Sequence, residues 1–328
     1  MLRPGERPTA GISPAGLSLG RTTVPGRPVV GAGAPGAGPG DEPAARRDPT
    51  SARLHSPAVP TATLAGILEL ERLDEDVHRA WTPPGTNRPD IFGGQVASQA
   101  LRAAALSVET DHLPDSVHCY FLRRGRPELP IDLVVERTRS GRTYTNRRVE
   151  ARQEGRTILT MLASFHAHEP GEEHELPMPE GVAPPTAGED WSNEPTGWEV
   201  PFELRDVPMA GPGVRFWGRV TDPFPPDPVL HACALLYASD MRAGSPAMEA
   251  IGVDPSGKSP DPARQGNFGS LDHALWFHRV PRVDRWFLSD VRVLTVRDAR
   301  GVVLGTMHDE DGHHLATFAQ EMFLKVPA

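Results

Sequence analysis

Apolar and polar positions alternate along consecutive stretches in the middle of the chain. This alternation is typical of β-strands with one buried face. The predicted strands cover Ser116–Leu122, Ile131–Ser140, Tyr144–Gln153 and Gly155–Ala167. The glycine-containing turn at Glu154-Gly155 separates the third strand from the fourth. This region therefore predicts a sheet of at least four antiparallel strands.

Two segments before these strands show helical spacing instead. Leu64–Ala80 has apolar residues near helical spacing and a charged opposite face, which predicts a helix. Further on, Gly93 and Gly94 precede an Ala-rich stretch from about Gln95 to Leu106. The small residues of this stretch predict a helix that is packed closely on several sides.

The second half of the chain repeats this plan. A predicted helix, Asp227–Met241, precedes a predicted strand, Leu271–Arg279. When Phe121 is aligned on Phe277, the glycine of the following turn lies 34 residues further on in the first half and 35 in the second. We therefore expect two copies of a helix wrapped by an antiparallel sheet. Their free sheet edges are expected to pair into one continuous sheet.

The first 60 residues differ in composition from the rest of the chain. They hold 11 Pro and 10 Gly, and no aromatic residue occurs before Trp81. Such a segment cannot bury enough apolar surface to offset the entropy of ordering it, so we predict disorder. A Pro/Glu-rich linker, Glu169–Trp191, separates the two copies. The predicted division is a tail (1–60), an N-terminal domain (61–175), a linker (176–200) and a C-terminal domain (201–328).

Charge and composition exclude several classes of protein. A net charge of -9 and a pI of about 5.8 argue against a protein that binds nucleic acid by neutralising phosphates. No stretch approaches the roughly 18 apolar residues of a membrane span. No apolar segment of a signal peptide follows the arginines near the start of the chain. We therefore expect a cytoplasmic protein without a membrane span.

Cysteine and histidine positions give no support for a metal site. Cys119 and Cys233 each lie within an apolar predicted strand or helix, so we expect inert buried thiols. The histidines near the predicted strands lack the spacing of metal ligands: His166, His168, His308, His313 and His314. We therefore predict no metal and no other cofactor.

An acid and an imidazole stand side by side in the second half, at Asp272 and His273. They are candidates for a catalytic acid and base. However, successive side chains of a strand point to opposite faces, so the two cannot reach one substrate without a bulge. We expect one of them to be a structural hydrogen-bonding residue.

Several longer motifs point to one family. In sequence order they are DIFGGQVASQAL, SVHCYFLRRG, RSGRTYTNRRVEARQEG, YASDM, SLDHALWFHR and FAQE. In this order and approximate spacing they resemble the type II acyl-CoA thioesterases (TesB-like), the double hotdog enzymes. The resemblance covers roughly residues 64–326. It implies an α+β fold, a double hotdog with two helix-wrapped antiparallel sheets in one chain.

The resemblance also implies a reaction, the hydrolysis of acyl-CoA to a free fatty acid and coenzyme A without a metal or a covalent intermediate. By motif match, the attacking water is held by Asp240, Ser270 and Gln320. Asp240 can serve as the base, provided that burial raises its pKa toward the working pH. Ser270 and the amide of Gln320 can each hydrogen-bond the same water.

Other residues are candidates for substrate binding. Gly93, Gly94 and Gln95 open a predicted helix, whose first N–H groups suit a developing oxyanion. His118 is a candidate base or substrate contact, although a satisfied core histidine is the commoner interpretation. Arg142 belongs to a run of arginines that suits either the phosphates of coenzyme A or an ordinary solvated strand face.

Two other functions remain open at this point. The first is an acyl-CoA hydratase or dehydratase, for which His231 lies too far from the end of its predicted helix to be convincing. The second is a non-catalytic acyl-CoA-binding protein, which the loss of Asp240 or Gln320 would favour, yet both are present. In each case free sheet edges and helix faces lead us to expect a homo-oligomer.

Overall fold

The computed structural model describes most of the chain beyond the tail. The described residues are 63–84, 88–188, 202–255, 260–261 and 266–326. The prediction that residues 1–60 are disordered lies outside them. Within the described residues, no helix is long and apolar enough to cross a membrane.

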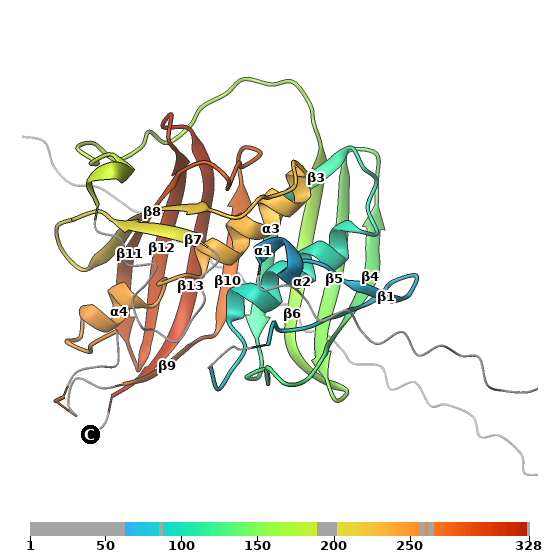
Figure 1. Ribbon diagram of the computed structural model, residues 1–328, viewed down its shortest axis with the longest axis horizontal. Helices are drawn as coiled ribbons and strands as arrows, with labels where there is room; N and C mark the ends of the chain where they lie inside the picture. The colour runs from blue at the N-terminus through green and yellow to red at the C-terminus, as the bar shows by residue number, and fades with distance from the viewer. Residues whose placement is uncertain (1–62, 85–87, 189–201, 256–259, 262–265, 327–328) are drawn as a thin grey trace, which may run out of the picture. The chain divides into compact units, whose positions relative to one another are not determined.

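The N-terminal half places one long helix against antiparallel strands (Figure 1). Its elements are α1 (Leu64–Ile67), β1 (Glu71–Asp74), β2 (Val77–Ala80), α2 (Gly93–Ala105), β3 (His112–Phe121), β4 (Ile131–Ser140), β5 (Tyr144–Gln153) and β6 (Arg156–Ala167). The strands of this half follow the order β1-β2-β4-β5-β6-β3. The four predicted strands and the Ala-rich helix are thus confirmed.

The C-terminal half has the same plan, with α3 as its long helix (Figure 1). Its elements are η1 (Pro185–Ala187), β7 (Phe202–Asp206), β8 (Gly213–Val220), α3 (Pro228–Ser239), α4 (Ser245–Glu249), β9 (Asn267–Ser270), β10 (Asp272–Phe277), β11 (Phe287–Arg297), β12 (Arg300–Asp309) and β13 (His314–Lys325). The strand order is β10-β13-β12-β11-β8-β7, and β9 pairs separately with β13. The predicted repeat of helix and sheet is therefore confirmed.

In the described part of the chain, one 13-stranded sheet joins the two halves. The seam is the antiparallel pairing of β3 with β10, which runs from Ser116 opposite Trp276 to Tyr120 opposite Asp272. The expectation that the two sheets pair edge to edge is confirmed. Each half thereby covers the strand edge that the other would leave exposed.

The two long helices lie close together on the inner side of the sheet. A Cβ atom on Gly94 of α2 would come within 2.7 Å of the Tyr237 carbonyl oxygen of α3 and within 2.5 Å of the Phe92 ring. Ala97 and Ala100 of α2 are fully buried in the same core. The small residues of the glycine- and alanine-rich motif therefore permit the close approach of the helices.

The two helices begin differently. α3 is capped by its own Asp227, whose Oδ1 accepts hydrogen bonds from the N–H groups of Val229 and Leu230 at 2.8 and 3.4 Å. α2 begins after Phe92, which makes no capping hydrogen bond with its side chain. The N–H groups of Gln95 and Val96 donate to the Phe92 carbonyl oxygen at 3.1 and 3.3 Å, so the N–H groups of Gly93 and Gly94 are those that need partners from elsewhere.

The segment Leu64–Ala80 is not the single helix that its spacing predicted. The helix ends at Ile67 after one turn, and the rest forms the β1–β2 hairpin. β2 pairs with β4, which buries His78 and Ala80. Tertiary pairing overrides the helical spacing because it satisfies the backbone of the sheet edge and buries alternate side chains.

Candidate active site

Asp240 lies where the two halves meet. It is the C-terminal cap residue of α3, and its carboxylate accepts a hydrogen bond from the N–H of Gly94 at the start of α2. A Cβ atom on Gly93 would come within 2.9 Å of Asp240 Oδ2. Glycine at position 93 therefore allows the carboxylate of one half to cap the helix of the other.

Gln320 connects Asp240 with Ser270. It lies on β13 and is 2% exposed. Its Nε2 donates hydrogen bonds to Asp240 Oδ1 at 3.0 Å and to Ser270 Oγ at 2.5 Å. Ser270 reaches this position because β9 pairs with β13, where Ser270 lies opposite Met322. The structure thus brings the three residues predicted as catalytic into one cluster, which we call the acid–hydroxyl–amide cluster.

The Asp272-His273 pair is divided between the two faces of β10. His273 is 1% exposed, with Nδ1 at 2.8 Å from Gln320 Oε1 and Nε2 at 2.8 Å from Ser239 Oγ. Asp272 points to the other face, where it accepts a hydrogen bond from the Glu321 N–H at 2.8 Å. The expected alternation of the two side chains is confirmed.

Burial dominates the electrostatics of the cluster. It raises the pKa of Asp240, and the rise is opposed first by His273 and then by hydrogen bonds from Gln320 and the Gly94 N–H. Burial also lowers the pKa of His273. At neutral pH His273 is therefore uncharged, and Asp240 binds a proton more readily than an exposed aspartate does.

The start of α2 is the part of the predicted substrate site that reaches the cluster. Gly93 and Gly94 lie against the Asp240 carboxylate. Gln95 follows in the first turn, and its buried side chain donates from Nε2 to Thr82 Oγ1 at 3.1 Å. The backbone of this turn, rather than the Gln95 side chain, therefore faces Asp240.

His118 and Arg142 lie elsewhere. His118 is exposed on the outer face of β3, edge-on to Trp276 with ring centroids 5.2 Å apart. The interpretation of His118 as a core histidine is therefore wrong, and the structure does not bring it to Asp240, because its neighbours Val117 and Cys119 point inward. Arg142 is exposed in the turn between β4 and β5.

The run of arginines around Arg142 is engaged with the protein itself. Carboxylates pair with three of its members: Arg137 with Asp76, and Arg148 and Arg152 with Glu150. Arg147 is buried and donates to the Ser107 carbonyl oxygen at 2.8 Å. For these four residues, the contacts favour a structural role over phosphate binding.

Two neighbours of the cluster, Ser239 and Arg88, were not among the residues predicted from the sequence. Ser239 directly precedes Asp240 in the YASDM motif, and this position was its only signal. Arg88 lies before α2, where burial lowers its pKa while the charges of Tyr237 and Asp240 raise it. The Arg88 guanidinium is therefore a cation near the Asp240 carboxylate. No pattern in the sequence links these two residues, because they lie far apart in the chain.

His231, the candidate for lyase chemistry, lies in the first turn of α3, at the opposite end of the helix from Asp240. Its Nδ1 accepts a hydrogen bond from the Val283 N–H at 3.2 Å. The side chain is buried and is engaged with the backbone. It is therefore not placed to act with the acid–hydroxyl–amide cluster.

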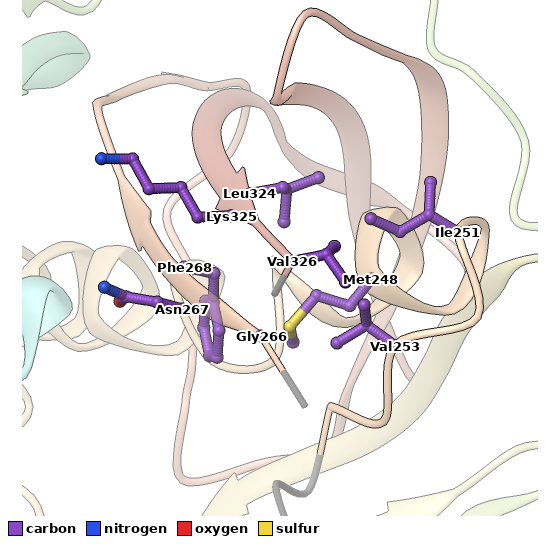
Figure 2. A pocket seen from close by; sticks show the side chains of 9 residues that line it. All are labelled: Met248, Ile251, Val253, Gly266, Asn267, Phe268, Leu324, Lys325 and Val326. Atoms are coloured by element: carbon purple, nitrogen blue, oxygen red, sulfur yellow. The ribbon is translucent and has the colours of Figure 1, made fainter. Parts of the chain in front are cut away.

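An apolar recess borders the start of β9 (Figure 2). It is lined by Met248, Ile251, Val253, Gly266, Asn267, Phe268, Leu324, Lys325 and Val326. In Figure 2 the side chains of Asn267 and Lys325 point away from the apolar group around Met248. Because side chains alternate along a strand, Phe268 and Ser270 face the same side of β9.

A continuous antiparallel sheet with one long helix in each half is the double hotdog architecture. Acyl-CoA thioesterase II TesB2 from Mycobacterium marinum has this fold with a TM-score of 0.66 and 32% identity, over 81% of this chain and 99% of its own. A tesB protein from Mycobacterium avium subs paratuberculosis gives a TM-score of 0.69 at 29% identity, over 81% and 98%. The expected fold class is thus confirmed.

Sequence comparison identifies the family. Residues 80–166 match the acyl-CoA thioesterase N-terminal domain, and residues 173–324 match the acyl-CoA thioesterase C-terminal domain. Acyl-coenzyme A thioesterase 8 of Homo sapiens is 33% identical over 294 residues, 79% of this chain and 88% of its own. Acyl-CoA thioesterase 2 of Haemophilus influenzae is 29% identical over 293 residues, 80% and 96% respectively. The chain belongs to the acyl-CoA thioesterase family and is an acyl-CoA thioester hydrolase.

Proposed function

We propose that the chain hydrolyses acyl-CoA by direct attack of a water molecule held by Asp240, Ser270 and Gln320. The observation that carries the proposal is the pair of hydrogen bonds from the Gln320 amide to the other two residues. One amide thereby holds a base and a hydroxyl side by side. The start of α2 lies against the same base, so a thioester carbonyl bound there would be within reach of the water.

Asp240 acts as the general base in this proposal. Its raised pKa makes it a better proton acceptor than an exposed aspartate. As the water oxygen bonds to the thioester carbon, one water proton passes to Asp240. The C–S bond then breaks, and the proton on Asp240 passes to the departing thiolate. The products are the free fatty acid and coenzyme A.

Ser270 and the backbone of α2 stabilise the charge that develops. Ser270 Oγ accepts a hydrogen bond from Gln320, so its own proton is available to the water or to the substrate. The N–H groups in the first turn of α2 carry partial positive charge, which suits the oxyanion of a tetrahedral intermediate. Gly93, Gly94 and Gln95 are therefore proposed to line the substrate site with their backbone. The Gly93 N–H is proposed as the donor to the oxyanion, because the Gly94 N–H donates to Asp240 and the Gln95 N–H donates to the Phe92 carbonyl oxygen.

The first test is the release of coenzyme A from saturated acyl-CoAs of short, medium and long chain, followed with a thiol-reactive dye. The wild type is compared with Asp240→Asn. We expect Asp240→Asn to lower kcat by at least about a hundredfold, because an amide cannot take the water proton. Binding of acyl-CoA should persist in the variant, since the apolar surfaces are unchanged.

Three outcomes would contradict this proposal. Near-normal turnover by Asp240→Asn would remove the assigned base. An acyl-enzyme trapped by rapid quench would replace the direct attack of water by a covalent route. Binding without turnover by the wild type would move the chain to the acyl-CoA-binding alternative.

A homo-oligomer and a cytoplasmic location stay predictions. Apolar side chains on the outer face of the central strands support self-association, since Tyr120 is 58% exposed, Leu162 55% and Trp276 39%. Size-exclusion chromatography with light scattering tests the assembly. A monomer at all concentrations would exclude it.

A further inference from the structure

We propose that His273 is a positioning residue that fixes the orientation of the Gln320 amide and, through it, the direction of the hydrogen bonds at Asp240 and Ser270. The inference rests on the proposed function of the acid–hydroxyl–amide cluster and extends it to a side chain that touches none of the reacting atoms. Ser239 holds His273 in place from the other side.

The imidazole of His273 is held on three sides. Nδ1 lies 2.8 Å from Gln320 Oε1, and Nε2 lies 2.8 Å from Ser239 Oγ. The ring stacks on Phe318 with centroids 5.5 Å apart and an interplanar angle of 27°. Turning the ring over would replace both nitrogens with carbons at these contacts and leave two buried polar groups without a partner. His273 therefore has a single orientation.

The proton on His273 follows from the charge of Asp240. To take the water proton, as proposed above, Asp240 must be ionised, and an ionised carboxylate only accepts hydrogen bonds. In that state the group of Gln320 that faces Asp240 Oδ1 at 3.0 Å is the amide nitrogen. The amide oxygen then faces His273, and this oxygen also only accepts. Nδ1 of His273 must therefore carry the proton, and Nε2 of the neutral ring must be an acceptor.

Ser239 completes the chain of donors. Its Oγ lies 2.8 Å from His273 Nε2 and 2.8 Å from the Leu236 carbonyl oxygen. One hydroxyl proton serves one acceptor, and among the described residues Ser239 is the side chain bonded to Nε2. The hydroxyl proton can go to the Leu236 carbonyl oxygen or to an unprotonated Nε2 of His273. With the ring proton on Nδ1, we infer that Ser239 donates to His273, so that donation runs in one direction from Ser239 through His273 to Gln320.

This direction matters for the reaction. When the Gln320 amide nitrogen faces Asp240 and Ser270, the Asp240 carboxylate accepts a hydrogen bond from it. The Ser270 proton then points away from Gln320. With the amide turned over, its oxygen would face the ionised carboxylate and would attract the Ser270 proton. Only the first orientation leaves Ser270 free to donate to water or substrate.

Loss of this hold changes the proton affinity of Asp240. Each element packed around the carboxylate contributes a group that interacts with Asp240 through its charge or a hydrogen bond. These groups are Gly94 of α2, Tyr237 of α3, Cys119 of β3, His273 of β10, Gln320 of β13, and Arg88 before α2. The Gln320 hydrogen bond favours the charged form of Asp240. A freely turning amide therefore raises the pKa of Asp240.

Two substitutions separate the ring nitrogens of His273. Asn places an amide N–H near the position of Nδ1, whereas Gln places one near the position of Nε2. We expect His273→Asn to stay within about fivefold of wild-type kcat, and His273→Gln to lose about 10- to 100-fold with KM changed less than about threefold. Equal kcat values for the two variants would overturn the proposal.

The pH profile separates positioning from general damage. In His273→Gln the acid limb of kcat/KM should move to higher pH, and in His273→Asn it should stay in place. His231→Asn is the matched control, since it removes another buried imidazole at the far end of α3. It should lower Tm without moving the limb. If the acid limb of kcat/KM moves equally in His273→Gln, His273→Asn and His231→Asn, His273 has only a structural role.

The tautomer itself is measured by nitrogen NMR of the wild type labelled at histidine. A protonated Nδ1 and an unprotonated Nε2 are expected for His273, and Ser239→Ala should shift this balance toward protonated Nε2. The reverse tautomer in the wild type would refute the proposal even if the position 273 variants fail to fold. Absence of coenzyme A release by the wild type would instead refute the proposed function, while the NMR result would stand.

Discussion

At the scale of single residues, Asp240 lies in surroundings that disfavour its charged form. Burial raises its pKa, and a few hydrogen bonds only partly oppose this. The surroundings that would make Asp240 a good base in the proposed mechanism therefore destabilise the folded protein whenever Asp240 is charged. Under that mechanism, activity at this position comes with a cost in stability.

This cost predicts a pH-dependent difference between the wild type and Asp240→Asn. A carboxyl whose folded pKa is raised binds its proton more tightly in the folded state, so its penalty is present above the folded pKa and disappears as pH falls through it to the unfolded value. The Tm of Asp240→Asn minus that of the wild type should therefore be most positive near pH 7 to 8. It should shrink toward about pH 4, the usual range of an aspartate.

Differential scanning calorimetry at stepped pH measures this difference, and the comparison of the two proteins cancels the other titrating groups. A difference that grows more positive as the pH falls would mean that the folded protein stabilises the charged carboxylate. The pKa of Asp240 would then be lowered rather than raised.

At the scale of elements, the start of α2 combines packing with chemistry. Gly94 approaches the Tyr237 carbonyl oxygen, and its N–H donates to Asp240. Gly94→Ala would gain about 0.5–1 kcal/mol from helix propensity but lose about 1–3 kcal/mol from overpacking. The clash is with backbone at 2.7 Å, which cannot turn aside as a side chain would. We expect a lower free energy of unfolding together with a lower kcat.

Gly171→Ala is the matched control for Gly94→Ala. A Cβ atom there would meet no atom within 4 Å, so denaturant unfolding should change by less than about 0.5 kcal/mol. Full stability and activity of Gly94→Ala would show that the two helices separate without cost. The glycine would then have no role in bringing Asp240 to α2.

Elements of this fold differ in how far they could be predicted from the sequence. The long helices and paired strands follow local periodicity, and they match the structure closely. The prediction of a single helix over Leu64–Ala80 was wrong. Its helical spacing competes with the pairing of β2 with β4, and the local pattern of residues gives no information about that contact. The cluster residues could be placed by motif, but the bonds of Gln320 to Asp240 and of His273 to Ser239 join different elements and could not.

At the scale of the whole molecule, the described structure begins only at residue 63. Among the described residues, the helices and strands of both halves and the members of the cluster lie between residues 64 and 325. Deletion of residues 1–60 is therefore expected to leave Tm and turnover unchanged, as measured by calorimetry and coenzyme A release. A large fall in Tm would show that the tail packs against the rest of the chain.

Under the proposed mechanism, the unequal ends of the two helices give one active site per chain. α3 ends in Asp240, whereas α2 ends in Leu106, which has no carboxylate to offer. The start of α3 is already capped by its own Asp227, so it has no need of an acid from the other half. One chain therefore contains two structural repeats, and the proposed mechanism gives it a single catalytic site. In a titration of active sites, each chain would be saturated by one molecule of substrate.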